Sequence, residues 1–315
     1  MGFVMSQKLK IAMFYASWEK FGEPWSTPLG FRWELESRGH EITLYNLYHA
    51  DGDILPRHTQ RTYSSASWNQ FHQDYSRGYK PDVVLVLDYG PFDCFQMDRK
   101  YFPDVTFVLE AGDTPQSFGN HAVKARKFDV IMTPDKQAAE RFTAMGVHGV
   151  WATHHGDERI FYPRPEIAIK YDCVTTCGGR RVTAAIQRAL GERFNNERYF
   201  FGNAHAERLC AGKMVFQCSQ FGEITRRVFE GMACGKMVIT DRLPPVTCME
   251  ELFVDGIDIV YYDNEQDAID KIKYYAEHDV ERESIARNGH EKVSTHHTVA
   301  KRVDLFEECI KRVKL

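Results

Sequence analysis

The sequence predicts an α/β protein of two doubly wound domains, each built on a parallel sheet. The first observation is the length, because 315 residues exceed one compact core and suggest two domains of about 150 residues each. The second is an alternation of short apolar segments with segments of helical periodicity, which occurs twice along the chain. The third is the irregular segment HHGDERIFYPRP at 154–165, whose two prolines predict a linker between the two series.

The first series covers residues 8–153. Strand, helix and strand follow one another at its start, which is typical of a βαβ unit. Strands are expected at 8–16, 41–47, 82–88, 105–110, 130–133 and 147–153, and helices at 28–38, 68–79 and 136–145.

The second series follows the linker. Strands are expected at 171–176, 197–201, 213–218, 237–240 and 257–261. Helices are expected at 181–193, from 223 onward, and at 265–277, 281–295 and 298–314.

Composition excludes several classes of protein. The formal net charge of −4 argues against a general polyanion binder, although a local basic patch stays open. No apolar run reaches the roughly 18 residues of a membrane span, and the start MGFVMSQKLK lacks the apolar core of a signal peptide. The eight cysteines are scattered without a CxxC pair, so we expect reduced thiols in a cytoplasmic protein and no structural metal.

The segment FGEITRRVFEGMACGKMVITD, at 221–241, carries the strongest functional pattern. Ile224, Val228 and Phe229 have helical spacing and face a core together, which leaves two arginines and two glutamates near the first two turns. A helix N-terminus suits phosphate, and a nearby carboxylate suits ribose hydroxyls. Gly231 allows the helix to approach a sheet closely. The apolar run at 237–240, just before Asp241, is expected to be a strand of that sheet. The segment therefore predicts a nucleotide-sugar clamp.

Three pieces of the second half then resemble one family in order: RRVFEGMACGKMVITD, MEELFVDGIDIVYYDNEQDAIDKI and ARNGHEKVSTHHTVAKRVDLF. Residues 221–306 are similar to the C-terminal half of GT-B glycosyltransferases of the CgeB-like, or glycosyl transferases group 1, family. The linker HGDERIFYP resembles the interdomain segment of related enzymes. The resemblance implies a GT-B fold with two Rossmann-like domains facing a central cleft. Residues 1–158 would bind the acceptor and 159–297 the donor, and the helix at 298–315 would cross back to the first domain.

The resemblance also implies an activity. The expected enzyme is a hexosyltransferase-like glycosyltransferase that moves a sugar from a nucleoside diphosphate sugar, UDP-linked, to an unidentified acceptor. It would act without metal or further cofactor and retain the anomeric configuration. Two alternatives stay open: a catalytically inactive GT-B binding or assembly protein, and a phage-type enzyme that acts on DNA bases. The partner class is a nucleotide sugar, and the oligomeric state stays open.

The donor residues are transferred from the family pattern one by one. Glu230 matches the second glutamate of a Glu-x7-Glu pattern and would bind the ribose, since a carboxylate accepts from both hydroxyls. The first glutamate of the pattern aligns with Gly222, so this sequence has no glutamate there. The nearest carboxylate is that of Glu223, one residue later. Glu223 is therefore either a catalytic carboxylate near the donor sugar or a charge that complements the helix dipole. Arg227 would meet the diphosphate, because a guanidinium forks onto phosphate oxygens.

Two further loops complete the expected donor site. The turn at Gly178, Gly179, Arg180 and Arg181 would stabilise the leaving diphosphate with backbone amides and cations. Gly202 and Asn203 follow an expected strand, where a nucleobase would lodge.

The acceptor side is expected in the first domain. Asp113 would deprotonate or orient an acceptor hydroxyl, or else cap a helix. Glu23 and Trp25 lie in the loop after the first strand, where acceptors enter this fold, and Trp25 either stacks on a sugar or packs in the core. The run 51–53 spells the metal-binding DxD of the other glycosyltransferase fold, but its irregular context predicts no metal site. A dehydrogenase is excluded because G-x-G-x-x-G is missing after the first strand.

Overall fold

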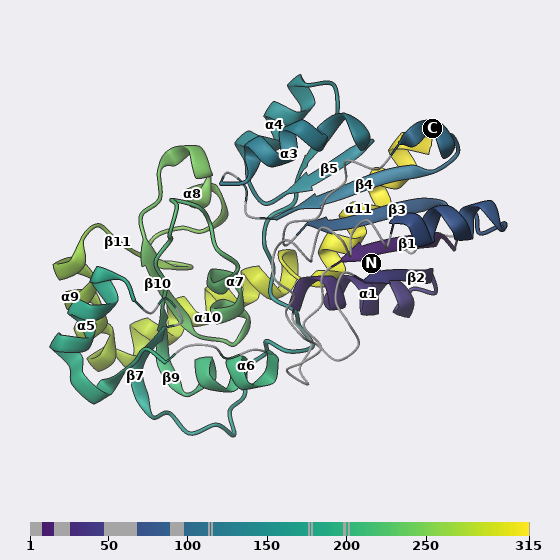
Figure 1. Cartoon of the computed structure of the whole chain (residues 1–315). Helices are drawn as coiled ribbons and strands as arrows, with labels where there is room; N and C mark the ends of the chain where they lie inside the picture. Colours follow the sequence, from purple (N-terminus) through teal and green to yellow (C-terminus); the bar gives the residue numbers. More distant parts are fainter. Residues whose placement is uncertain are drawn as a thin grey trace. The chain divides into compact units, whose positions relative to one another are not determined.

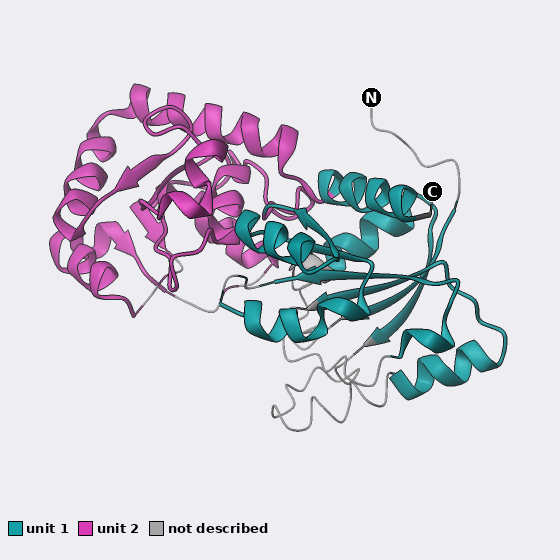
Figure 2. Ribbon diagram, turned by 90° about the horizontal axis from the view of Figure 1, so that it is seen from above, with its two compact units in different colours: residues 1–153, 300–315 teal, residues 154–299 magenta. Residues whose placement is uncertain are grey.

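The computed structural model describes residues 8–15, 26–46, 68–88, 98–112, 114, 116–175, 177, 179–197, 200 and 202–314. The chain divides into two compact units, which Figure 2 shows in two colours. Unit 1 holds residues 1–153 and 300–315, and unit 2 holds residues 154–299. Each unit is a parallel sheet with helices around it (Figure 1), which confirms the predicted α/β class of two Rossmann-like domains. No helix of the described chain is both long and apolar enough to cross a membrane.

The sheet of unit 1 has six parallel strands in the order β2-β1-β3-β4-β5-β6. They are β1 (Lys10–Tyr15), β2 (Glu41–Asn46), β3 (Val83–Asp88), β4 (Thr106–Ala111), β5 (Val130–Thr133) and β6 (His148–Trp151). All six were predicted, with bounds within three residues, because buried parallel strands are continuous apolar runs.

One face of this sheet carries an aromatic core. The side chains of Phe14 and Phe107 on the strands pack with Trp68 and Phe71 of a helix at 68–76. Two further helices cover the same face, α3 (Phe118–Lys124) and α4 (Lys136–Ala144). Short 3-10 helices stand at η2 (Arg99–Tyr101) and η3 (Ala125–Lys127).

The last helix of the chain, α11 (Val299–Lys314), packs on unit 1, as predicted. It meets the end of α1 (Ser26–Ser37) through a buried polar network. The Arg38 guanidinium donates to Asp304 at 2.8 Å and to Glu307 at 3.2 Å. His40 Nε2 lies 2.9 Å from the other oxygen of Glu307, and both side chains are 2% exposed. The network ties the C-terminal helix to the N-terminal part of the same unit.

The sheet of unit 2 has five parallel strands in the order β11-β10-β9-β7-β8. They are β7 (Tyr171–Thr175), β8 (Phe194–Asn195), β9 (Gly212–Phe216), β10 (Met237–Asp241) and β11 (Val260–Tyr262). The helices are α5 (Arg181–Leu190), α6 (Gly202–Cys210), α7 (Arg226–Ala233), α8 (Met249–Leu252), α9 (Glu265–Glu277) and α10 (Asp279–His296), with 3-10 turns at η4 (Gly191–Arg193) and η5 (Pro245–Thr247).

Helices cover both faces of this second sheet. α6 and α7 pack on one face with Val174, Val215 and Val238, whereas α5 and α9 pack on the other. Gly231 of α7 touches the sheet directly, since a Cβ there would lie 2.9 Å from Val238 Cγ2. The prediction that this glycine allows a close approach is confirmed.

One element prediction in unit 2 is wrong, and two elements begin three residues later than predicted. The strand expected at 197–201 is not found at the described residues of that range, since Glu197 and Phe200 lie in no strand, and the two-residue β8 stands earlier. The helix α6 takes its place a few residues later, with Ala206, Leu209 and Cys210 buried at helical spacing. The helix expected from 223 begins at Arg226, and β11 begins three residues later than predicted.

Candidate functional site

The sheet of unit 2 reverses its strand order between β7 and β9. β7 comes first in the chain, β8 is added on one side of it, and β9, β10 and β11 are added on the other. In open parallel sheets, ligands bind at the carboxyl ends of the strands where such a reversal occurs. The loops after β7 and β9 start at this point, and their described residues are 177, 179–180 and 217–225. Both loops carry residues that the sequence predicts for the donor diphosphate.

The loop after β9 is held by a chain of hydrogen bonds. Asp241, at the end of β10, accepts from the amide nitrogen of Ser219 at 2.9 Å. The Ser219 hydroxyl donates to Glu223 Oε2 at 2.9 Å, and the Phe221 amide donates to the same oxygen at 2.7 Å. Glu223 thus organises the loop before α7, which explains why the helix starts at Arg226 rather than at Glu223. Its prediction as a catalytic carboxylate stays untested.

The loop after β7 joins the loop after β9 through Arg180. Gly179 adopts a φ of +78°, and Arg180 follows as the N-cap of α5. The Arg180 guanidinium donates to Gln220 Oε1 at 2.5 Å. Arg181 is 89% exposed and lies 2.6 Å from a carboxylate oxygen of Glu265 on α9. Of the two arginines predicted here, Arg180 therefore bridges the two candidate donor loops and Arg181 pairs with a neighbouring helix.

The first turn of α7 presents the other predicted phosphate contacts. Arg227 is exposed on that turn. Gly222 precedes it with a φ of +73° and no atom within 4 Å of where a Cβ would stand. An amide-rich turn with a guanidinium beside it can bind a phosphate group.

Glu230, the predicted ribose residue, lies one helical turn after Arg226 with its side chain 9% exposed. Its Oε2 is 3.3 Å from His205 Nε2, and its Oε1 is 3.9 Å from Arg226 Nε. Burial raises the pKa of Glu230, but His205, Arg226 and Arg227 outweigh burial, so the net shift is downward. The carboxylate is therefore ionised, acceptor-only and held on one side by His205.

His205 is a candidate functional residue that the sequence did not indicate. It lies on α6, a helix absent from the prediction, and it meets Glu230 only because α6 and α7 cover the same face of the sheet. A buried histidine in a helix of mixed composition carries no local signal of its partner.

The predicted nucleobase residues begin α6. Gly202 adopts a φ of +52°, and the Asn203 side-chain oxygen accepts from Arg164 Nη2 at 2.6 Å. The same nitrogen of Arg164 donates to the Ile160 carbonyl at 3.0 Å. Arg164 therefore fixes the first turn of α6, a role without a sequence signal because the two residues are far apart in the chain.

Two thiols meet between the candidate donor loops. Cys177 Sγ donates to Gln217 Oε1 at 2.7 Å and accepts from the Cys218 amide at 3.2 Å. The hydrogen bond with Cys218 lowers the pKa of Cys177 to about 7, although burial alone would raise it. The positive charge of Arg227 also lowers this pKa. The same contact and burial raise the pKa of Cys218. Both thiols are buried, in agreement with the interpretation of these cysteines as core residues.

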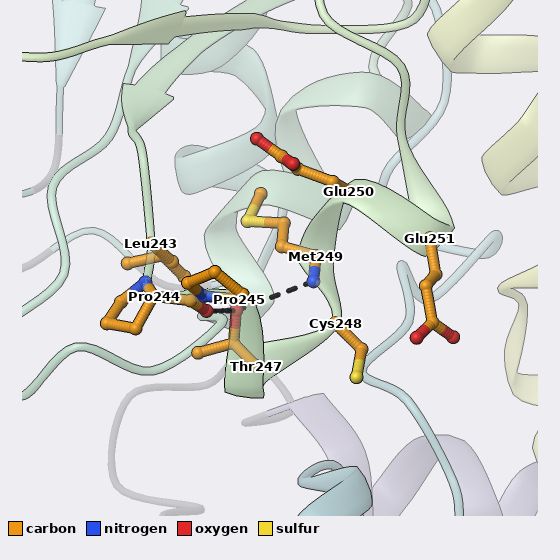
Figure 3. A pocket seen from close by; sticks show the side chains of 8 residues that line it. All are labelled: Leu243, Pro244, Pro245, Thr247, Cys248, Met249, Glu250 and Glu251. Carbon is orange, nitrogen blue, oxygen red and sulfur yellow. Dashed lines mark hydrogen bonds between the residues drawn. The ribbon is translucent and has the colours of Figure 1, made fainter.

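A cavity of about 320 Å³ lies in the loop after β10 (Figure 3). It is lined by Leu243, Pro244, Pro245, Thr247, Cys248, Met249, Glu250 and Glu251. Glu250 is paired with Arg242 at 2.6 Å. No residue of this lining was predicted for the site.

Four predicted site residues lie outside the described part of the chain: Asp113, Gly178, Glu23 and Trp25. The DxD run at 51–53 lies outside it as well. Within the described ranges, no three His, Cys, Asp or Glu side chains gather as metal ligands would.

The comparisons with known proteins agree on one fold. Residues 164–308 match the family model described as glycosyl transferase-like. No curated protein matches the chain at a significant level.

Several solved structures share the architecture. Sucrose-phosphate synthase of Thermosynechococcus elongatus is similar with a TM-score of 0.71 and 11% identity, over 97% of this chain and 99% of its own. Anabaena Alr3699/HepE in complex with UDP-glucose is similar with a TM-score of 0.66 and 13% identity, over 96% and 100%. UDP-GlcNAc 2-epimerase of Neisseria meningitidis bound to UDP-GlcNAc is similar with a TM-score of 0.62 and 10% identity, over 96% and 100%.

These likenesses confirm the predicted GT-B fold, and the family match supports the predicted transferase class. The CgeB-like subgroup and the individual site residues stay predictions.

Proposed function

We propose that this protein, whose residues 164–308 match the glycosyl transferase-like family model and whose fold is GT-B, transfers a sugar from a nucleoside diphosphate sugar to an acceptor. UDP-linked sugars are the first donors to test, because similar structures were solved with UDP-glucose and UDP-GlcNAc. The acceptor is left unassigned.

One observation carries the proposal. The strand order of unit 2 reverses between β7 and β9, and the two loops that start there are linked by the Arg180–Gln220 hydrogen bond. α7 follows the second loop directly and carries Arg227 and Glu230. The turn before α7 suits the diphosphate of a nucleoside diphosphate. The ionised carboxylate of Glu230, one to two helical turns further along, suits its ribose hydroxyls.

The proposed roles follow from the residue types. Arg180 and Arg227 would neutralise the charge that develops on the leaving diphosphate, usually the largest electrostatic contribution to such a reaction. Glu230 would accept hydrogen bonds from the ribose hydroxyls. With cations supplied by side chains, the proposal needs no metal, and it includes retention of the anomeric configuration. A cytoplasmic location belongs to the same proposal, because the described cysteines form no disulfide and reduced thiols are typical of reducing compartments.

A thermal-shift panel tests the donor class. UDP-, GDP-, ADP- and TDP-sugars are added one at a time, and the right donor raises the melting temperature by mass action. The product of the successful donor is then identified by NMR with candidate acceptors and without any, which separates transfer, hydrolysis and epimerisation and gives the anomeric configuration. A flat panel with every nucleotide sugar contradicts the proposal.

Glu230→Ala tests the site itself. We expect donor affinity to fall by about 1–3 kcal/mol, because hydrogen bonds to a charged group are lost. Glu283→Ala removes a carboxylate that is 62% exposed on α10 and serves as the control, with unchanged affinity. Equal donor affinity in the wild type and Glu230→Ala would contradict the assignment of this residue.

A non-catalytic binding protein is the second candidate function. It is favoured by Glu223, whose Oε2 accepts from both Ser219 and the Phe221 amide and so serves the loop rather than a sugar. Donor binding in the thermal-shift panel without any turnover of the bound sugar would select this candidate.

A further inference from the structure

The ribose residue of the proposed function has one close polar partner among the described residues, His205. Glu230 and His205 are 7% and 6% exposed, and their side chains meet at 3.3 Å. Arg226 Nε is more distant from the carboxylate, at 3.9 Å, beyond hydrogen-bond length. His205 therefore makes the tightest contact with this carboxylate.

A carboxylate in such a place needs a partner to stay charged. Burial favours the neutral carboxyl, which would present a hydroxyl donor to the ligand instead of an oxygen acceptor. The contact with His205 opposes burial more strongly than the charges of Arg226 and Arg227 do.

The imidazole is itself held in place. The Phe161 ring meets it edge-on, with ring centroids 5.7 Å apart and planes at 80°. Its helix α6 is fixed at the first turn by the 2.6 Å bond between Arg164 and Asn203. The ring thus has a packed environment on one side and the Glu230 Oε2 atom on the other, which leaves Oε1 for a further hydrogen bond.

We propose that His205 is a positioning residue for Glu230: it keeps the carboxylate ionised and holds Oε2, so that Oε1 accepts hydrogen bonds from the ribose of a nucleoside diphosphate. This inference rests on the proposed function. It extends the donor site from α7 to α6, the helix that also carries Gly202 and Asn203.

A role confined to holding α6 against α7 predicts something different. Loss of packing alone would weaken all nucleotides by the same factor. Loss of positioning weakens recognition of the ribose hydroxyls in particular, so it changes the ratio between a nucleoside diphosphate and its 2′-deoxy analogue.

The experiment measures the Kd of UDP and 2′-deoxy-UDP, or of the corresponding pair for the base that the thermal-shift panel selects. Calorimetry is done on the wild type, His205→Ala, His205→Gln and Glu230→Gln, each checked for folding by its thermal melt. His290→Ala is the matched control, because His290 touches α7 through the Met232 carbonyl at 3.1 Å rather than through the Glu230 carboxylate.

We expect the wild type to prefer the ribose form by about tenfold, the worth of hydrogen bonds to a charged group. The ribose preference should fall to about twofold in His205→Ala and in Glu230→Gln. It should be partly restored in His205→Gln, because the glutamine amide can still donate a hydrogen bond. It should be unchanged in His290→Ala. If His205→Ala does not fold, the ribose preference of His205→Gln is compared with that of Glu230→Gln. A preference that is kept in His205→Gln and lost in Glu230→Gln supports a hydrogen bond donated to the carboxylate.

Three results overturn the inference. The first is a wild-type ribose preference that persists in a folded His205→Ala protein. The second is a wild-type protein that binds the nucleotide without any ribose preference, which leaves the proposed function standing. The third is an unchanged preference in Glu230→Gln. Absence of nucleotide binding by the wild type contradicts the proposed function first and the inference with it.

Discussion

At the scale of single residues, the half-buried Asp241 and the buried Glu230 of unit 2 differ in charge preference because their partners differ. Burial raises the pKa of Asp241, and the bonds from Ser219 and Thr240 only partly offset it. Burial also acts on Glu230, but His205 and two arginines lower its pKa in spite of it. A cationic partner, rather than depth of burial, decides which of the two acids is stabilised as an anion.

This contrast predicts opposite pH dependences of stability. The lowered pKa of Glu230 stabilises the fold above its ordinary value of 4.5, and this contribution is lost as the pH falls through the folded-state pKa. Glu230→Gln should therefore destabilise the protein at pH 7 and approach the wild type in acid. Asp241 has a raised pKa, so its charge costs stability above that pKa, and the cost disappears below its ordinary value of 3.8.

Asp241→Asn, which keeps an acceptor oxygen for Ser219, should accordingly be at least as stable as the wild type at pH 7, with the difference shrinking toward pH 4. Urea unfolding of all three proteins from about pH 2 to pH 8 covers both transitions and gives both profiles. Parallel profiles for the two variants would contradict the account of their charges.

At the scale of elements, the position of α7 against the sheet depends on its small residue Gly231 as much as on its apolar residues. Val228, Phe229 and Met232 are buried, and Gly231 lets the helix backbone approach β9 and β10. The helix also carries the exposed Arg227 and the buried Glu230, so the distance between helix and sheet sets where those side chains stand.

Gly231→Ala should therefore destabilise unit 2 by about 1–3 kcal/mol, as overpacking of a core does. The new methyl would stand 2.9 Å from Val238 Cγ2 and 3.3 Å from Val215 Cβ. Gly119→Ala is the control, since its methyl would meet nothing within 4 Å, and alanine is the better helix former by about 0.5–1 kcal/mol. Chemical denaturation that ranks Gly231→Ala at or above the wild type would exclude the close contact.

At the scale of the whole molecule, the chain returns to its first unit at the end. Residues 300–315 belong to unit 1 (Figure 2). There the Glu307 carboxylate accepts a hydrogen bond from Arg38 and meets His40. His40 Nδ1 accepts from the Leu9 amide at 3.1 Å, so its Nε2 carries the proton that points to Glu307. Each polar group in this network has a hydrogen-bond partner within it, so the loss of one group removes a partner of another.

Glu307→Ala should destabilise unit 1 by about 1–3 kcal/mol, because it leaves the buried His40 imidazole without its acceptor, whereas Arg38 keeps Asp304. Glu308→Ala, whose carboxylate is 55% exposed and pairs with Arg312, should change stability by less than about 0.5 kcal/mol. Protease digestion followed by mass spectrometry locates the effect, with earlier cleavage in α1 and α11 for Glu307→Ala. Equal resistance of the two variants would show that α11 is held by its apolar face alone.

The sequence by itself determined the two alternating series, the strands of both sheets apart from β8, and the helix and strand around Gly231. These elements are local, since each is specified by the spacing of its own apolar residues and by the turns that bound it. The family pattern added Arg227 and Glu230 for the same reason, because both stand in one continuous segment.

Only the tertiary structure decided the partners of those residues. His205 meets Glu230, Asp241 supports the loop that Glu223 closes, and Arg164 holds Asn203, each from a distant part of the chain. A buried polar group must find a partner wherever the fold brings one within reach, and no local spacing records which residue that is. The charge of Glu230 is for this reason a property of two helices on one sheet face and not of its own segment.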